Sequence, residues 1–232
     1  MSGWQDELDK LISPRGLKCL CCDELSYGEW LCPTCEKALK AMRLPEQEAR
    51  NGDVYSVYQY EGVAKDLVLL LKEEKTAFAA QALASEMVHV IKQWQLPPET
   101  ILTWVTMPRI RLIKRGMDHG YELCTAVAEQ CEGLQVRQLL QRTGRVHTQR
   151  GLNREKRQEN LSGTFCCHEE LSGPVLLIDD VLTTGATSSV CAEVLLAAGA
   201  TQVYVLTATK ANGKVPRFDF GKVGFLYGLY NA

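Results

Sequence analysis

The sequence predicts an α/β protein in which a central, mostly parallel sheet with flanking helices follows a small cysteine-rich module. Two observations carry this prediction. From residue 51 onward, apolar runs typical of buried strands alternate with segments of helical apolar periodicity. Five of the ten cysteines fall within the first 35 residues, in a segment poor in core-forming side chains. We therefore expect a module with its linker over residues 1–50 and a main domain over residues 51–232.

Length and charge limit the classes of function. A chain of 232 residues can hold one full domain and a small module. Its 26 basic and 28 acidic residues nearly cancel, which argues against a general nucleic-acid or membrane binder. The start of the chain carries early acids without an apolar segment, and the longest apolar stretch, residues 67–71, is too short to span a bilayer. We expect a cytoplasmic protein without membrane insertion, whose cysteines are mostly reduced.

The N-terminal cysteines form two Cys-x-x-Cys knuckles, Cys19 with Cys22 and Cys32 with Cys35. Four thiolates that meet at one point are the ligand set that tetrahedral Zn²⁺ prefers. A structural zinc ion would replace the missing core, and four thiolates leave no open position for catalysis. Cys21 could in principle displace a neighbouring cysteine as ligand, but its spacing is worse. Two alternatives stay open: a redox motif at Cys32 and Cys35, although no strand precedes it, or knuckles without metal.

The elements of the main domain follow in order after a polar linker at residues 41–53. Alternation of apolar and polar residues indicates the first strand, and Pro97-Pro98 ends the second helix. We expect strands at residues 54–60, 101–106, 136–140, 175–178 and 203–206. We expect helices at residues 63–72, 78–94 and 121–132, and a last one that carries Val190, Val194, Leu195 and Ala198 and ends at Gly199.

The strand at residues 175–178 leads into the most informative motif. This unbroken run of aliphatic residues is typical of a strand buried on both faces, and Asp179 and Asp180 follow it. A loop of small residues before a helix presents backbone N–H groups to an oxyanion, while the preceding acids suit hydroxyls or Mg²⁺. The combination predicts a site for a ribose 5-phosphate. The loop residues are Thr183, Thr184, Gly185, Ala186 and Thr187.

Two segments of the main domain concentrate positive charge. Residues 107–119 follow the strand at 101–106, and residues 141–160 are polar enough for a mobile lid. A solvated surface is the plainer interpretation of each, but beside a phosphate loop both would suit a pyrophosphate. The first segment holds Arg109, Arg111, Lys114 and Arg115; the second holds Arg142, Arg145, Arg150, Arg154, Lys156 and Arg157.

Asp179-Asp180 followed by residues 183–187 resembles the phosphoribosyl pyrophosphate (PRPP) motif of type I phosphoribosyltransferases. In that family the two acids hold the ribose 2′ and 3′ hydroxyls, and the loop holds the 5′-phosphate. The resemblance implies a type I phosphoribosyltransferase-like fold that binds PRPP with Mg²⁺. It does not indicate the acceptor.

The double knuckle, Arg115-Gly116 and the pattern from Arg142 to Phe165 resemble the ComF family, which includes the GntX-type DNA-utilization proteins. The resemblance extends from Cys19 to about Ala208 and implies a zinc module on a phosphoribosyltransferase domain. Family members are associated with natural competence, the uptake or use of external DNA. This chain departs from the family at residues 117–119, which read Met-Asp-His instead of Phe-Asn-Gln. It also has Glu73-Glu74-Lys75 where a glycine usually follows the lysine matched by Lys72.

Three functions follow as hypotheses. In a phosphoribosyltransferase, Asp179 and Asp180 would hold the ribose while Mg²⁺ and the basic segments, including Arg109, Lys114, Arg115, Arg154 and Arg157, neutralise departing pyrophosphate. His119 and His147 lie where they could contact phosphate. The second hypothesis is a non-catalytic PRPP- or nucleotide-sensing adaptor for DNA-uptake or recombination proteins. The third is binding of single-stranded DNA along the basic segments. We expect residues 211–232 to form an edge strand or a packing segment.

Overall fold

The computed structural model describes residues 18–74, 77–143, 163–213 and 217–218. Its centre is a six-stranded sheet of order β1-β2-β8-β7-β3-β4, in which every neighbouring pair is parallel except β1 with β2. The expected α/β class with a mostly parallel sheet is therefore confirmed. The strands are β1 (Arg50–Asn51), β2 (Val54–Gln59), β3 (Ile101–Trp104), β4 (Gln135–Val136), β7 (Val175–Leu182) and β8 (Val203–Lys210). A separate antiparallel pair joins β5 (Gln141–Arg142) to β6 (Phe165–Cys166).

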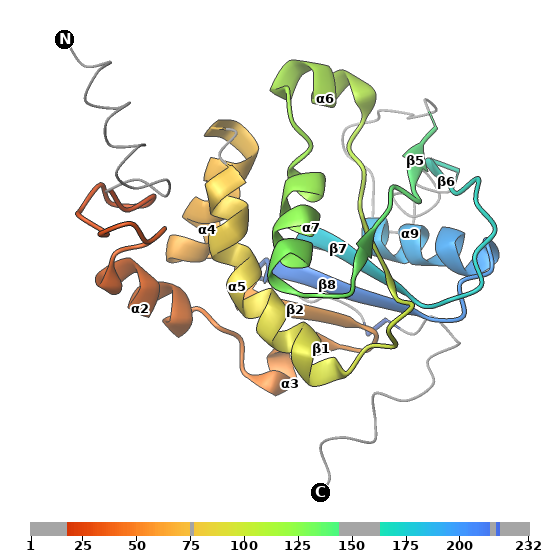
Figure 1. Ribbon diagram of the computed structural model, residues 1–232, viewed down its shortest axis with the longest axis horizontal. Coiled ribbons are helices and arrows are strands. Elements are labelled where there is room, and N and C mark those ends of the chain that lie inside the picture. The colour runs from red at the N-terminus through yellow and green to blue at the C-terminus, as the bar shows by residue number, and fades with distance from the viewer. Residues whose placement is uncertain (1–17, 75–76, 144–162, 214–216, 219–232) are drawn as a thin grey trace, which may run out of the picture.

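Helices cover both faces of the sheet (Figure 1). One face carries α4 (Gly62–Leu69), α5 (Ala77–Trp94) and α7 (His119–Gln130), and the other carries α9 (Ala186–Ala197). The sheet separates two apolar cores, and alternate residues of β7 belong to each of them. Leu176 and Ile178 lie in the first core, and Val175 and Leu177 lie in the second. All four side chains are fully buried, as expected for a strand covered on both faces.

The segment expected as a polar linker is packed structure. After α2 (Pro33–Ala41), the chain forms α3 (Glu46–Ala49) and then β1, the antiparallel edge of the sheet. Leu44 and Ala49 are buried, and the Leu44 N–H donates to the Val57 carbonyl at 2.9 Å. These two apolar side chains, spaced among the charged ones, dock the segment on β2.

Other elements differ from expectation in their bounds, and one short helix was not expected. β7 continues through Leu182, so Asp179 and Asp180 lie within the strand. The helix after β2 ends in a π-helical turn, η1 (Leu70–Glu74), and the first basic segment contains a short exposed helix, α6 (Arg109–Arg115). β4 contains only two residues. None of the helices in the described part of the chain is long and apolar enough to cross a membrane.

Phe218, at the end of the described chain, contacts both the turn after β1 and the loop that precedes α9. Its N–H donates to the Asn51 carbonyl at 3.3 Å, and its own carbonyl accepts from the Asp53 N–H at 3.0 Å. Between them, Gly52 has a φ of +69°, and a Cβ on it would lie 1.8 Å from the Phe218 oxygen. The Phe218 ring covers Gly185, where φ is +74° and a Cβ would lie 1.7 Å from Cζ. The packing role expected for the tail holds for this residue.

Gly185→Ala should therefore lower the free energy of unfolding by about 2 to 4 kcal/mol, because it adds a steric clash to the cost of a left-handed residue. Gly133→Ala is the matched control, since Gly133 has a φ of +89° but no described atom within 4 Å of an added Cβ. It should cost only about 1 kcal/mol. Urea denaturation measures both. Equal costs, or a Gly185→Ala cost unchanged in a Phe218→Ala background, would contradict the contact.

Candidate functional site

Four cysteines of the N-terminal module converge on one point. The sulfur atoms of Cys19, Cys22, Cys32 and Cys35 all lie within 4.8 Å of one another, and the Cys22 and Cys32 sulfurs are 3.6 Å apart. A tetrahedral zinc site with Zn–S bonds of about 2.3 Å has sulfur–sulfur edges of about 3.8 Å. The backbone N–H of Cys35 also points at the Cys32 sulfur, at 3.5 Å, as in a knuckle turn. The cluster is thus compatible with a structural zinc ion.

The thiols of this turn have different environments. Burial opposes the thiolate of Cys19, but hydrogen bonds from the backbone of Cys32, Cys21 and Cys22 outweigh it and lower the pKa of Cys19 to about 7. For Cys21, burial and then the charge of Cys19 raise the pKa to about 12. Cys21 is outside the four-sulfur cluster. Burial raises the pKa of Cys35 as well, so it is the position of Cys21, and not its ionisation, that sets it apart from the four.

Asp180 lies at the carboxyl end of β7, on the face covered by α4 and α7. Its Oδ2 atom is 2.9 Å from the Lys72 Nζ and 2.9 Å from the His119 Nε2, and its side chain is only 7% exposed. Burial would raise the pKa of Asp180, but the hydrogen bond from His119 and the charge of Lys72 outweigh it and hold the pKa below its usual value. Asp180 is therefore ionised and already paired.

Asp179 has a different environment from its neighbour. Its Oδ1 accepts the Asp180 N–H at 2.9 Å, and the charged groups that act on it include Asp180 itself. Burial, and then the adjacent Asp180 charge, raise the pKa of Asp179 to about 7. Arg142 and Cys191 lie on its side of the sheet, since each interacts electrostatically with Asp179. The two acids thus point to opposite sides of β7, and one of them holds a proton near neutral pH.

The loop after β7 leads into the N-terminus of α9. Gly185 is the N-cap residue in left-handed conformation, and no described side chain caps the helix. The Ala186 N–H has only a long contact, 3.5 Å, to the Thr184 hydroxyl. Backbone N–H groups of this first turn can therefore bind an oxyanion beside the two acids. Of the hydroxyl residues, Thr183 is exposed, and Thr184 and Thr187 are half-buried.

The basic residues predicted for the site separate into three groups. Arg115 reaches it, because its Nη1 lies 3.4 Å from the His119 Nδ1. Arg109 and Lys114 are exposed on α6, and among the described residues they form no ion pair with Asp179 or Asp180. Arg154 and Arg157, with His147 and most of the second basic segment, lie outside the described residues. Arg142 instead stacks on Phe165 and donates from Nε to the Thr106 carbonyl at 2.9 Å.

The sequence did not reveal the partners of Asp180. Lys72 comes from η1, and π-helical turns are frequent at functional sites. His119 opens α7, and Asp118 before it caps that helix while its Oδ2 accepts from the Trp104 Nε1 at 3.2 Å. Asp118 and His119, two of the residues at which this chain departs from the ComF pattern, thus have structural roles. Of the two partners of Asp180, only Lys72 had a signal in the sequence, because it matches a lysine of that pattern.

Comparison with known proteins adds a relationship over most of the chain. No family model matches it. DNA utilization protein YhgH of Salmonella typhi is 26% identical over an alignment of 212 residues, which covers 87% of this chain and 93% of that protein. The protein of the same name from Escherichia coli K12 is 24% identical over an alignment of 220 residues, which covers 84% of this chain and 97% of that protein. This chain is therefore similar to DNA utilization protein YhgH over most of its length.

Solved structures similar to this chain include an amidotransferase and a phosphoribosyl transferase. Glutamine PRPP amidotransferase from B. subtilis gives a TM-score of 0.36 at 18% identity over 56% of this chain, which spans only 26% of the amidotransferase chain. Hypoxanthine phosphoribosyl transferase from Trypanosoma cruzi gives 0.36 at 14% identity, with 65% of this chain and 71% of that chain covered.

Proposed function

We propose that this protein binds PRPP or a related ribose 5-phosphate with Mg²⁺, at the carboxyl end of β7, in the service of DNA uptake or the use of external DNA. The observation that carries the proposal is the succession of Asp179 and Asp180 in a buried strand and Gly185 at an uncapped helix N-terminus. The 5′-phosphate would bind the first-turn N–H groups of α9. The ribose hydroxyls would lie against the two acids.

Three side chains support binding of the pyrophosphate on the Asp180 side. Lys72 and His119 face the carboxylate of Asp180, and Arg115 stands behind His119. An incoming pyrophosphate offers these donors a stronger anion than one carboxylate, so it would draw them from Asp180 and free that acid for the ribose. Mg²⁺, which accompanies PRPP as part of the substrate, would offset charge on the pyrophosphate oxygens.

The reaction class that fits this arrangement is phosphoribosyl transfer. A nitrogen nucleophile attacks the ribose anomeric carbon, the bond from that carbon to the pyrophosphate oxygen breaks, and the electron pair leaves with pyrophosphate. Asp179 and Asp180 would stabilise the ribose as positive charge develops, and Lys72 and Arg115 would neutralise the leaving group. A binding protein without turnover is the second candidate, and the pairing of Asp180 with both Lys72 and His119 favours it.

Calorimetric titration with Mg²⁺-PRPP tests the proposal. The wild-type protein should bind one equivalent, and the double variant Asp179→Asn, Asp180→Asn should bind at least about 100-fold more weakly, because charge-assisted hydrogen bonds are worth about 1.5 to 3 kcal/mol each. Glu132→Gln, which replaces one exposed carboxylate by an amide, serves as the control. Absence of binding by the folded wild-type protein would refute the proposal.

The same titration mixture distinguishes the two candidates. Pyrophosphate release from bound PRPP in the presence of nucleobases or other nitrogen acceptors would establish transfer. Binding without release for every acceptor would leave the non-catalytic sensor, whose expected partners are proteins of DNA uptake or recombination. Retention of zinc during these experiments is expected if the four cysteines hold the proposed structural ion.

A further inference from the structure

The short helix α6 carries a large share of the exposed apolar surface. Seven large hydrophobic side chains are exposed in the described part of the chain, and three of them, Ile110, Leu112 and Ile113, lie on this one helix. Ile110 is 81% exposed and Ile113 is 75% exposed. No residue of α6 is buried, and Figure 1 shows the helix at the outer end of the two chain segments that join it to β3 and α7. The apolar side chains of α6 therefore do not serve the core.

The spacing of the residues places the two isoleucines between two cations. Successive residues of a helix are turned by about 100°, so Ile110 and Ile113 lie on one face. Lys114 follows Ile110 by four residues and Arg109 precedes Ile113 by four residues, so that one cation flanks each side of the pair. The exposed face of α6 is thus an apolar ridge with a basic border.

The positive charge of α6 is not compensated nearby. Residues 100–117 contain four cations and no acidic residue, in a chain whose net charge is −2. Among the described residues, Arg109, Arg111 and Lys114 form no ion pair. Arg115, the fourth cation, contacts His119 in the β7 site instead. The other three cations remain available to a ligand outside that site.

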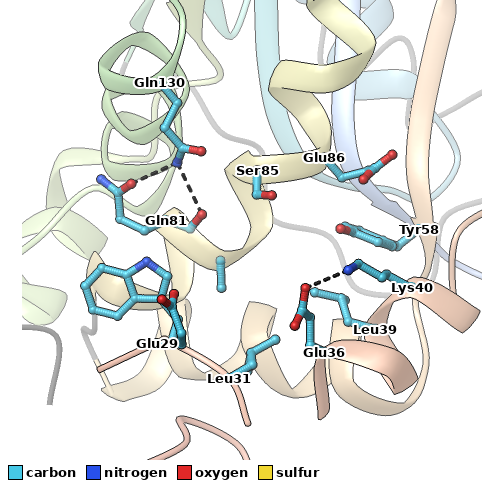
Figure 2. Close-up of a pocket in the computed structure, with 12 residues that line it drawn as sticks. Glu29, Leu31, Glu36, Leu39, Lys40, Tyr58, Gln81, Ser85, Glu86 and Gln130 are labelled. Atoms are coloured by element: carbon cyan, nitrogen blue, oxygen red, sulfur yellow. Dashed lines mark hydrogen bonds and ion pairs between the residues drawn. The ribbon is translucent and has the colours of Figure 1, made fainter. Parts of the chain in front are cut away.

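A pocket of about 460 Å³ between the cysteine module and the main domain differs from α6 in its charges. Figure 2 shows Lys40 directed at Glu36, and the two groups pair at 2.6 Å. Glu86, which also lines the pocket, pairs with Arg43 at 2.6 Å. The Tyr58 hydroxyl in the same pocket is neutral, because burial and then the charge of Glu86 raise the pKa of Tyr58. These ion pairs are formed within the fold, whereas the cations of α6 have no such partner among the described residues.

An anionic lipid surface matches both parts of the ridge on α6. The cations of an amphipathic helix bind lipid phosphates, while its apolar side chains enter the boundary of the acyl chains. A nucleic acid would use the cations but leave the isoleucines in water, and α6 has no aromatic side chain on which a base could stack. The groove of an acidic protein would have to be shaped for a convex ridge, whereas a fluid bilayer adapts to it.

We propose that α6 docks the protein on an anionic lipid bilayer, with Ile110 and Ile113 at the outer ends of the acyl chains and Arg109 and Lys114 at the lipid phosphates. The protein would lie on the bilayer, since no helix in the described part of the chain is long and apolar enough to span it. Each cation near such a surface is worth about fivefold in affinity. This inference does not depend on ribose phosphate binding at the β7 site.

Co-sedimentation of the full-length, zinc-loaded chain with lipid vesicles tests the proposal. Vesicles of phosphatidylcholine and phosphatidylglycerol in equal amounts should bind the protein at least about 20-fold more tightly than vesicles of phosphatidylcholine alone. In about 0.5 M NaCl this preference should be lost, because salt screens the surface charge. Hydrogen exchange over residues 107–117 should slow when the anionic vesicles are present.

Two double variants and a control locate the contact. Ile110→Ser with Ile113→Ser should weaken binding to the anionic vesicles at least about tenfold, because it removes the apolar surface that enters the bilayer. Arg109→Gln with Lys114→Gln should weaken it about 25-fold. Leu25→Ser, which changes an exposed leucine of the cysteine module, should leave the affinity within about twofold. All three proteins should keep the wild-type unfolding temperature, since the changed side chains are exposed.

Two results would overturn the proposal directly. One is failure of the folded wild-type protein to bind anionic vesicles at about 5 mM lipid, and the other is wild-type affinity of the isoleucine variant. A single-stranded oligonucleotide of about 20 thymidines is the competing probe. If it binds while the vesicles do not, and only the arginine–lysine variant weakens its binding, then α6 contacts nucleic acid and the lipid proposal is wrong.

Discussion

Cys32→Ser should abolish tight zinc binding and unfold the cysteine module. Structural zinc sites contribute about 10 to 16 kcal/mol in small zinc-dependent folds, and the module has little other core to replace that free energy. The buried sulfurs of Cys19 and Cys35 would lose the metal ion that the four cysteines are proposed to bind. Helix α2 would lose the Cys32 sulfur, which caps the helix by accepting from the Cys35 N–H. Metal analysis and hydrogen exchange over residues 18–41 measure the two effects.

Cys21→Ser is the control for this change. Cys21 is in the same turn, but it lies outside the four-sulfur cluster. The variant should keep one zinc ion per chain and show wild-type hydrogen exchange. Zinc retained by Cys32→Ser, or lost from Cys21→Ser, would show that the ligand set is wrong.

The adjacent acids of β7 should respond to amide substitution with opposite signs. At pH 8, Asp180→Asn should lower the free energy of unfolding by about 2 to 4 kcal/mol, because it leaves Lys72 without its buried counter-charge and His119 without a charged acceptor. Asp179→Asn should raise it by about 1 to 3 kcal/mol, because it removes a carboxylate that is buried beside another one. Urea denaturation of both variants measures the difference.

The pH dependence of stability follows from the same pKa shifts. The pKa of Asp180 is lowered on folding, so its contribution is present above the unfolded value of about 3.9 and is lost as pH falls through the folded value. The pKa of Asp179 is raised to about 7, so the folded state holds an extra proton and loses stability as pH rises from about 4 to about 7. In Asp179→Asn this decline should vanish. Variants that shift stability in the same direction would contradict the two environments.

A carboxylate that costs stability at neutral pH is informative about selection. Asparagine at position 179 would keep the acceptor for the Asp180 N–H without the charge. Proteins often retain such destabilising groups at sites where a ligand needs them. The expected gain in stability and loss of PRPP affinity in one variant would therefore link the strand end to binding.

The sequence was sufficient to predict the elements whose signals are local. The aliphatic run at residues 175–178 identified the central strand, and periodicity located α5 within one residue at its start and to its last residue at Trp94. The spacing of the cysteines predicted the four-sulfur cluster, because ligands close in sequence can meet with few geometric choices. In each case the pattern and the structure are separated by few backbone degrees of freedom.

Contacts between distant segments could not be predicted in this way. Lys72 and His119 meet Asp180 only because η1 and the start of α7 converge above the sheet. Tyr58 looked like one residue of an alternating strand, and only the position of the module makes its hydroxyl part of a pocket. α6 was hidden by its composition, since a seven-residue exposed helix rich in cations has no apolar face toward a core.

The order of strands also has a consequence for how the protein is made. Ser56 in β2 bonds to Thr207 in β8 at 2.7 Å, although 151 residues separate them in the chain. During translation, β2 leaves the ribosome long before β8 and keeps an unpaired edge until those 151 further residues have been made. Such long-range pairing slows folding and exposes apolar strands to aggregation. The four cysteines of the module lie within 17 residues, from Cys19 to Cys35, so their cluster can form without waiting for β8.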